Sequence, residues 1–141
     1  MDSRFDAETI AYLQMIQDIV SRMSNISVAF KGLAATLFAG ALSISMPESL
    51  PRRIAVLSAA FAVVILLCFC DCNYLLCERR YRRLYNEVRL GNHECDFDLS
   101  VGRPCWHEML NCFSSFSICL YYGALVLVLS VAILLSAINV V

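Results

Sequence analysis

Long parts of this chain lack charged residues. The stretch Met109–Val141 contains no Asp, Glu, Lys or Arg. Two further stretches carry one charge each: Val28–Met46 has only Lys31, and Ile54–Cys77 has only Asp71. A helix of about 20 apolar residues crosses the ~30 Å hydrocarbon core of a bilayer. Each stretch is long enough to do so, and the scarcity of charge excludes a soluble bundle, whose helices need polar outer faces.

Signals of catalysis are also missing. The chain has only five glycines, and it contains no G-x-S-x-G, no H-E-x-x-H and no glycine loop that could cradle a phosphate. We therefore expect that this protein is not an enzyme and that it uses no cofactor.

Metal-binding signals are weak, although the chain has eight cysteines. The strongest pattern is His93-x-Cys95 followed by Cys105-x-His107, which supplies two cysteines and two histidines. These are zinc-ligand types, but the usual C-x2–4-C and H-x3–5-H spacings are absent. Coincidence in a cysteine-rich chain is the favoured interpretation, so we expect no metal centre, and these four residues remain only a weak candidate set.

Proline and glycine are absent between Arg53 and Gly91, which predicts one uninterrupted helix over about 53–89. Such a helix is roughly 55 Å long, well beyond the thickness of the bilayer core. Its last part, Glu78–Arg89, should therefore project into the cytoplasm. Residues Ile10, Leu13 and Ile16 recur at helical spacing near the N-terminus and predict an amphipathic helix. It could lie on the membrane surface, but its polar face has a single arginine, which favours packing on protein.

The expected fold is an all-α integral membrane protein with three transmembrane helices. Its expected segments are a cytoplasmic amphipathic helix (1–27), transmembrane helix 1 (28–46), an outside turn (47–53), transmembrane helix 2 (54–77), a cytoplasmic helix extension and loop (78–108), and transmembrane helix 3 (109–141).

The basic residues predict the orientation. Only Arg52 and Arg53 lie between the first two expected spans, whereas the other nine Lys and Arg lie before residue 32 or between residues 79 and 103. Short loops rich in Lys and Arg stay in the cytoplasm. The N-terminus is therefore expected inside and the C-terminus outside.

Charged and hydroxyl residues near the membrane suggest gating or pore residues. Asp71 is expected to pair with Lys31 at the same end of its span, and Glu78 with Arg82 at i, i+4. The Lys31–Asp71 pair could be a static bridge that sets helix register, or it could control a gate. Ser117 and Ser130 in the third span could solvate ions, or they could bond their own backbone.

A basic cluster follows the second span. It consists of Arg79, Arg80, Arg82 and Arg83, with Tyr81 and Tyr85 beside them. One interpretation is topology anchoring by contact with lipid headgroups. The alternative is a cytoplasmic site for an anion such as a nucleotide or short nucleic acid, in which arginines bind phosphates and tyrosines stack on bases.

Small residues form a stripe on the first span. Gly32, Thr36 and Gly40 fall four residues apart, a pattern that permits close helix approach within the chain or between subunits. Three helices cannot enclose a pore, so a channel would require a homo-oligomer.

Several runs carry a resemblance to a known family. They are Asn25–Gly32, the charged motif of Asp71–Tyr85, Asp96–Asp98 and Tyr121–Gly123. Over about residues 20–125 the chain resembles small three-helix bacterial membrane proteins of phage-defence loci, and in size and layout it is similar to the membrane component of Hailong systems. Cys72-Asn73 departs from the motif, where an aromatic residue is commoner.

The resemblance implies a tetrameric ion channel in the bacterial inner membrane, with the C-terminus periplasmic. It also implies a partner nucleotidyltransferase whose short DNA or cyclic-nucleotide products gate the channel from the cytoplasm. Two alternatives need no such ligand: an accessory or anchoring subunit of a larger complex, and a holin-like permeabiliser.

Overall fold

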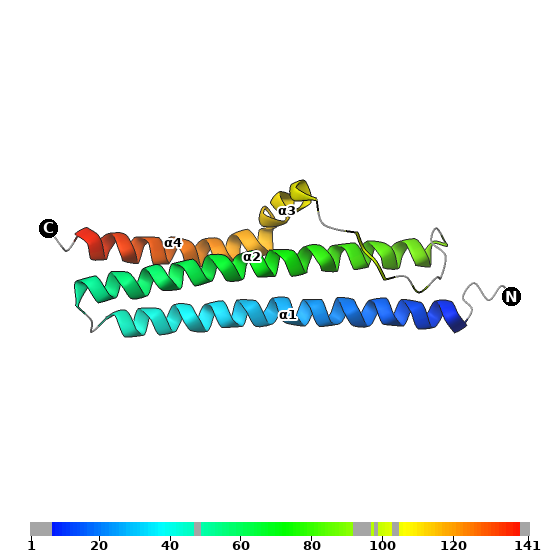
Figure 1. Cartoon of the computed structure of the whole chain (residues 1–141), viewed down its shortest axis with the longest axis horizontal. Coiled ribbons are helices and arrows are strands. Elements are labelled where there is room, and N and C mark those ends of the chain that lie inside the picture. Colours follow the sequence, from blue (N-terminus) through cyan, green and yellow to red (C-terminus); the bar gives the residue numbers. More distant parts are fainter. Residues whose placement is uncertain (1–6, 47–48, 92–96, 98, 103–104, 139–141) are drawn as a thin grey trace.

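The computed structural model describes residues 7–46, 49–91, 97, 99–102 and 105–138, and all regular structure within them is helical (Figure 1). The helices are α1 (Ala7–Ser45), α2 (Leu50–Arg89), α3 (Trp106–Phe113) and α4 (Phe116–Ile138). Of these, α1, α2 and α4 are long and apolar enough to cross a membrane. The expected all-α class is therefore confirmed, and the described residues contain three helices that could span a membrane, as expected.

Helices α1 and α2 run antiparallel along their whole lengths, whereas α4 lies along only the first half of α2 (Figure 1). One end of the molecule is therefore a three-helix bundle. The other end is a two-helix stalk, which we define as residues 7–25 of α1 and 78–89 of α2. The expected amphipathic helix and the first span are one continuous helix of 39 residues, because α1 passes from stalk to bundle without a break.

The seam between α1 and α2 follows a seven-residue repeat, as in antiparallel coiled coils. Buried residues at this spacing are Ser27, Ala34 and Ala41 on α1 and Leu57, Val64, Asp71 and Glu78 on α2, whereas the buried stalk residues Tyr12, Ile16, Leu84 and Val88 fall outside it. The hydrogen bond between Ser27 and Asp71 sets the register. Seven-residue steps from that pair bring small side chains of α1 opposite larger ones of α2, so the two helices can approach closely.

Two separate apolar clusters hold the hairpin together. The larger lies in the bundle and includes Leu57, Leu67 and Leu129. The smaller lies in the stalk and is built from Tyr12, Ile16, Leu84 and Val88. The amphipathic segment thus packs on the α2 extension through Ile16 and Leu13, as expected, but Tyr12 is buried with them and Ile10 is 48% exposed, so the contact face is rotated from the expected one.

The outer surface of the bundle is apolar. Val28 on α1 is 67% exposed, Leu66 on α2 61%, and Leu127 on α4 64%. Large apolar side chains on every helix of a bundle fit contact with lipid, since water would oppose so much exposed apolar area.

The connection between α1 and α2 is shorter than expected. Helix α2 begins at Leu50 rather than near residue 53, because Pro51 fits the first helical turn, where its missing N–H costs nothing. Arg53 donates from Nε to the Ser45 carbonyl and from an Nη to the Met46 carbonyl, both at 3.0 Å. It thereby satisfies carbonyls at the C-terminal end of α1. At its other end α2 stops at Arg89, as predicted.

The expected single helix over 109–141 is two helices in the structure. Helix α3 ends at Phe113, and α4 begins at Phe116. The carbonyl of Ser115 accepts hydrogen bonds from the backbone N–H groups of Ile118 and Cys119. These bonds form the first turn of α4, which runs in a different direction from α3. Figure 1 shows α3 pointing away from the bundle at this point.

Two buried thiols attach α3 to the middle of α2. The Cys112 thiol contacts the carbonyl of Cys72 at 3.3 Å, and the Cys72 thiol contacts the carbonyl of Met109 at 3.8 Å. Both side chains are fully buried. These cysteines act as small apolar residues with weak donors, so the α2–α3 contact is tight.

Candidate functional site

A buried polar cluster lies in the bundle, within the apolar part of α2. The carboxylate of Asp71 is completely buried, and its Oδ2 lies 2.9 Å from Lys31 Nζ. The Ser27 hydroxyl donates to Oδ1 of Asp71, and Lys31 Nζ donates to the Ser27 hydroxyl at 2.9 Å. The structure thus brings together the predicted Lys31–Asp71 pair and adds Ser27, one turn before Lys31, as its bridge.

Helix α4 completes this cluster. The Tyr121 hydroxyl donates to the backbone carbonyl of Lys31 at 2.7 Å. The neighbouring Tyr122 is 2% exposed, and its hydroxyl is buried without a hydrogen-bond partner among the described residues. All three helices that could span a membrane therefore meet around Asp71. Sequence reasoning missed Ser27, Tyr121 and Tyr122, and the adjacent tyrosines in an uncharged span were the available signal.

A carboxylate and an ammonium group in an apolar bundle form an energetically sensitive arrangement. Each charge is costly to bury, and the pair is tolerated because the partners compensate one another. The Tyr122 hydroxyl lies beside this pair, so α4 contributes to the polar surroundings of Asp71.

The second predicted ion pair lies at the base of the stalk. Arg82 Nε donates to Glu78 Oε1 at 2.8 Å, and an Nη of Arg82 lies 2.7 Å from the same oxygen. Glu78 is largely buried in the α1–α2 seam, whereas the Arg82 side chain is 61% exposed. The carboxylate therefore orients an arginine whose outer side remains accessible.

Arg80 serves a structural contact rather than an open ligand site. Its guanidinium donates to the carbonyls of Val101 and Gly102 and to the carboxylate of Glu108. These bonds hold the described part of the connection before α3 against α2. The hydrogen bond from Arg80 also lowers the pKa of Glu108 below its ordinary value, with a smaller contribution from the backbone amide of Cys105.

The rest of the basic cluster is divided among different faces. Arg79 donates to the Ser115 hydroxyl at 3.0 Å, at the break between α3 and α4. The Tyr81 hydroxyl donates to the Leu99 carbonyl at 3.2 Å. Arg83 lines a small hollow with Glu87 and Glu108. Within one chain, the four arginines and two tyrosines expected as one anion site do not form a single site, because they point around the helix.

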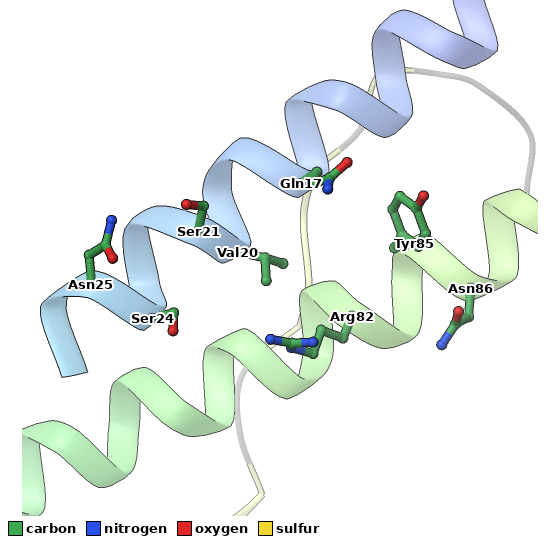
Figure 2. Close-up of a pocket in the computed structure, with 8 residues that line it drawn as sticks. All are labelled: Gln17, Val20, Ser21, Ser24, Asn25, Arg82, Tyr85 and Asn86. Carbon is green, nitrogen blue, oxygen red and sulfur yellow. The ribbon is translucent and has the colours of Figure 1, made fainter. Parts of the chain in front are cut away.

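Arg82 and Tyr85 do share a groove, which lies between α1 and α2 in the stalk (Figure 2). Its volume is about 550 Å³. It is lined by Gln17, Val20, Ser21, Ser24 and Asn25 from α1 and by Arg82, Tyr85 and Asn86 from α2. Apart from Val20 and the body of Tyr85, this lining is polar. The groove falls between the two apolar clusters, where the seam contains serine and asparagine instead of larger apolar residues.

The predicted pore serines differ in their surroundings. The Ser130 hydroxyl donates to the Val126 carbonyl of its own helix at 2.7 Å, the backbone-bonding alternative raised above. Ser117 is exposed on the surface of α4. Neither residue lines a channel within one chain.

The small-residue stripe faces outward from the single chain. Gly32 and Thr36 are exposed, and a Cβ built on Gly32 or Gly40 would meet nothing within 4 Å. The buried face of α1 is the different set that contains Ala34 and Ala41. The stripe thus does not pack on α2, so packing within the chain does not account for it.

The weak zinc candidate is only partly visible. His93 and Cys95 lie outside the described residues. Cys105 and His107 are exposed, and a ring nitrogen of His107 lies 3.2 Å from the Asn111 amide nitrogen. Over the residues that the structure describes, no three His, Cys, Asp or Glu side chains are grouped to hold a metal ion.

Comparisons with protein-family models, with curated proteins and with solved structures found no match for this chain. The fold alone therefore defines the class of this protein, which is helical, with three helices that can cross a membrane and a two-helix stalk.

Proposed function

We propose that this chain is the subunit of a homo-oligomeric ion channel in the bacterial inner membrane, gated at its stalk by a nucleotide or short nucleic acid. The buried Ser27–Lys31–Asp71 cluster carries the proposal. Ionised groups inside a membrane are rare and costly, and they characteristically mark ion pathways or the elements that control them. Here the cluster lies where all three spanning helices meet, so a change in helix packing would alter it directly.

Oligomerisation is supported by the outward face of α1. Gly32, Thr36 and Gly40 leave room for the backbone of another helix, and the single chain does not use that room. A ring of copies could enclose a path that three helices alone cannot. We propose four copies, as the sequence resemblance implies.

The proposed orientation places the stalk in the cytoplasm and the end of α4 in the periplasm. It rests on the distribution of Lys and Arg, which are numerous in and after the stalk part of α2 and sparse between α1 and α2. A cytoplasmic stalk would meet the nucleotide products of a partner nucleotidyltransferase. In this proposal the protein acts as an effector of antiphage defence.

Ion flux tests the proposal directly. The purified protein is reconstituted in liposomes that contain a potassium-sensitive dye, and flux is recorded with and without added mononucleotides and short oligodeoxynucleotides. We expect flux whose rate changes when one of these anions is present. Asp71→Asn should change the basal flux, whereas Asp18→Asn, at an exposed position of the stalk, should not. Absence of flux under every condition would exclude a channel.

Two other functions predict different results in the same assay. A holin-like permeabiliser would conduct at a rate that no nucleotide alters. An accessory or anchoring subunit would be monomeric when purified and would give no flux. The buried cluster favours the channel over an anchor, because ionised groups inside a membrane characteristically mark ion pathways or the elements that control them.

A further inference from the structure

The groove in the stalk differs from the rest of the α1–α2 seam. On either side the seam is closed by apolar clusters, and between them no residue of α1 from Gln17 to Ile26 is fully buried. The lining from α1 includes Ser21, Ser24 and Asn25, of which Ser24 is half-buried and the other two are exposed. These small and polar side chains leave a groove between the helices, where apolar side chains close the seam elsewhere.

The lining indicates the chemistry of an occupant. It offers side-chain amides from Gln17, Asn25 and Asn86, which can donate and accept at once, as the edge of a nucleobase requires. Tyr85 supplies an aromatic ring, on which a base can stack. Figure 2 shows Tyr85 pointing from α2 toward Gln17 on α1.

Arg82 supplies the only charge of the lining. Its guanidinium lies between the helices in Figure 2, and Glu78 engages one side of it, which leaves further N–H donors. Arginine binds phosphate through paired N–H groups. A volume of about 550 Å³ lies within the ordinary range for small-molecule sites.

We propose that this groove binds one nucleoside monophosphate unit, with its phosphate on Arg82 and its base against Tyr85 and the amides. The inference rests on the ligand-gated function proposed above and names the site and the size of its ligand. The unit could be a free mononucleotide or the terminal nucleotide of an oligomer, since both present the same phosphate, sugar and base. The adjacent Arg79, Arg80 and Arg83 are outside this site.

Binding of labelled adenosine monophosphate to the full chain in nanodiscs tests the proposal. We expect saturable binding that weakens as salt rises, and at least tenfold weaker binding in Arg82→Gln. Arg83→Gln removes the same charge from the next residue and should stay within about twofold of the unaltered chain. Tyr85→Phe should retain affinity because the ring remains, whereas Tyr85→Leu should lose it. Ser24→Leu should block the groove while leaving the helical fold intact by circular dichroism.

Several outcomes would overturn the site. One is absence of adenosine monophosphate binding to the unaltered chain. Equal competition by inorganic phosphate would show a simple anion site without base recognition, and competition by vesicles of phosphatidylglycerol would show a lipid-headgroup site. Equal losses in the Arg82 and Arg83 variants would show non-specific attraction. One further outcome would instead support the site. If a tetranucleotide binds more tightly than the mononucleotide and Ser24→Leu abolishes that binding, the ligand is the terminal nucleotide of an oligomer.

The binding and flux measurements separate the two proposals. Nucleotide binding that depends on Arg82, without any ion flux, would retain the site and exclude the channel. Nucleotide-dependent flux that is unchanged in Arg82→Gln and Ser24→Leu would retain the channel and exclude this groove.

Discussion

At the scale of single residues, the charged groups inside the bundle, Lys31 and Asp71, form an ion pair. Asp71 Oδ2 lies 2.9 Å from Lys31 Nζ, and its Oδ1 accepts a hydrogen bond from the hydroxyl of Ser27. Such an ion pair adds little net stability, but separating its two partners is costly. A buried ion pair contributes little compared with an apolar replacement, but removing one partner leaves a buried charge alone.

A double-mutant cycle should reveal this coupling. Asp71→Asn or Lys31→Met alone should each destabilise the protein, with a cost of about 3–5 kcal/mol where the remaining charge stays buried. The double variant should lose far less than the sum, because neither charge remains. Thermal unfolding in detergent measures the three free energies. Additive losses would show that the two residues do not interact.

The Arg80–Glu108 pair should be visible by titration. Arg80 lowers the pKa of Glu108 below its ordinary value of 4.5. The carboxylate therefore contributes stability above pH 4.5 that is lost as pH falls through the lower, folded-state pKa. In Arg80→Gln we expect the pKa of Glu108 to rise toward 4.5, measured by carbon NMR of labelled glutamate. Arg83→Gln, which removes a weaker electrostatic influence, should raise it less.

At the scale of elements, the close contact of α1 and α2 depends on small residues. Ala34 is completely buried in the seam, and its neighbour Ala35 is exposed. Ala34→Leu should force the helices apart and cost about 1–3 kcal/mol, the usual penalty for overpacking. Ala35→Leu adds the same side chain on the outer surface and should leave stability nearly unchanged. Unfolding in detergent compares the two variants, and equal effects would contradict this seam.

The elements also show what the sequence could predict. The length of α2 and its end at Arg89 followed from the absence of Pro and Gly up to Gly91. The break between α3 and α4 did not, because Ser114 and Ser115 occur in continuous helices as readily as in interruptions. The anchoring of α3 through Cys72 and Cys112 comes from contacts distant in sequence, which no local pattern records.

The candidate site, too, could be predicted only in part. Lys31 and Asp71 could be paired because each was the lone charge of its span and both fell at the same depth. The role of Arg80 could not be separated from those of its neighbours, since it depends on where the connection near Gly102 folds back. The groove could not be foreseen, because it requires knowing that Ser24 faces α2.

At the scale of the whole molecule, the bundle presents apolar surface on all sides and carries one outward stripe of small residues. Lipid can cover the large side chains such as Leu66 and Leu127. The stripe of Gly32, Thr36 and Gly40 allows the backbone of another helix to pack closely against α1, and lipid tails are a poor substitute for that contact. The proposed oligomer therefore has a defined contact that can be altered without disturbing the chain itself.

Larger residues on the stripe should separate assembly from folding. A Cβ at Gly32 or Gly40 meets nothing within 4 Å in the single chain, so Gly32→Leu and Gly40→Leu begin into open space, and they replace a poor helix former with a good one. We expect unfolding temperatures at or above that of the unaltered chain, together with a shift from oligomer to monomer by native mass spectrometry in detergent. An oligomer that persists in both variants would place the subunit contact elsewhere.

The uninterrupted helix α2 has a mechanical consequence. From Asp71 to Arg89 it runs roughly 27 Å without a proline or glycine that could bend it. Because Ser27 and Asp71 link it to α1 partway along, a tilt of about 10° at that link would swing the stalk tip by roughly 5 Å. In the proposed channel the stalk would therefore act as a lever, which would magnify small adjustments among the spanning helices and, when its tip is held by ligand, transmit force back to the buried charges.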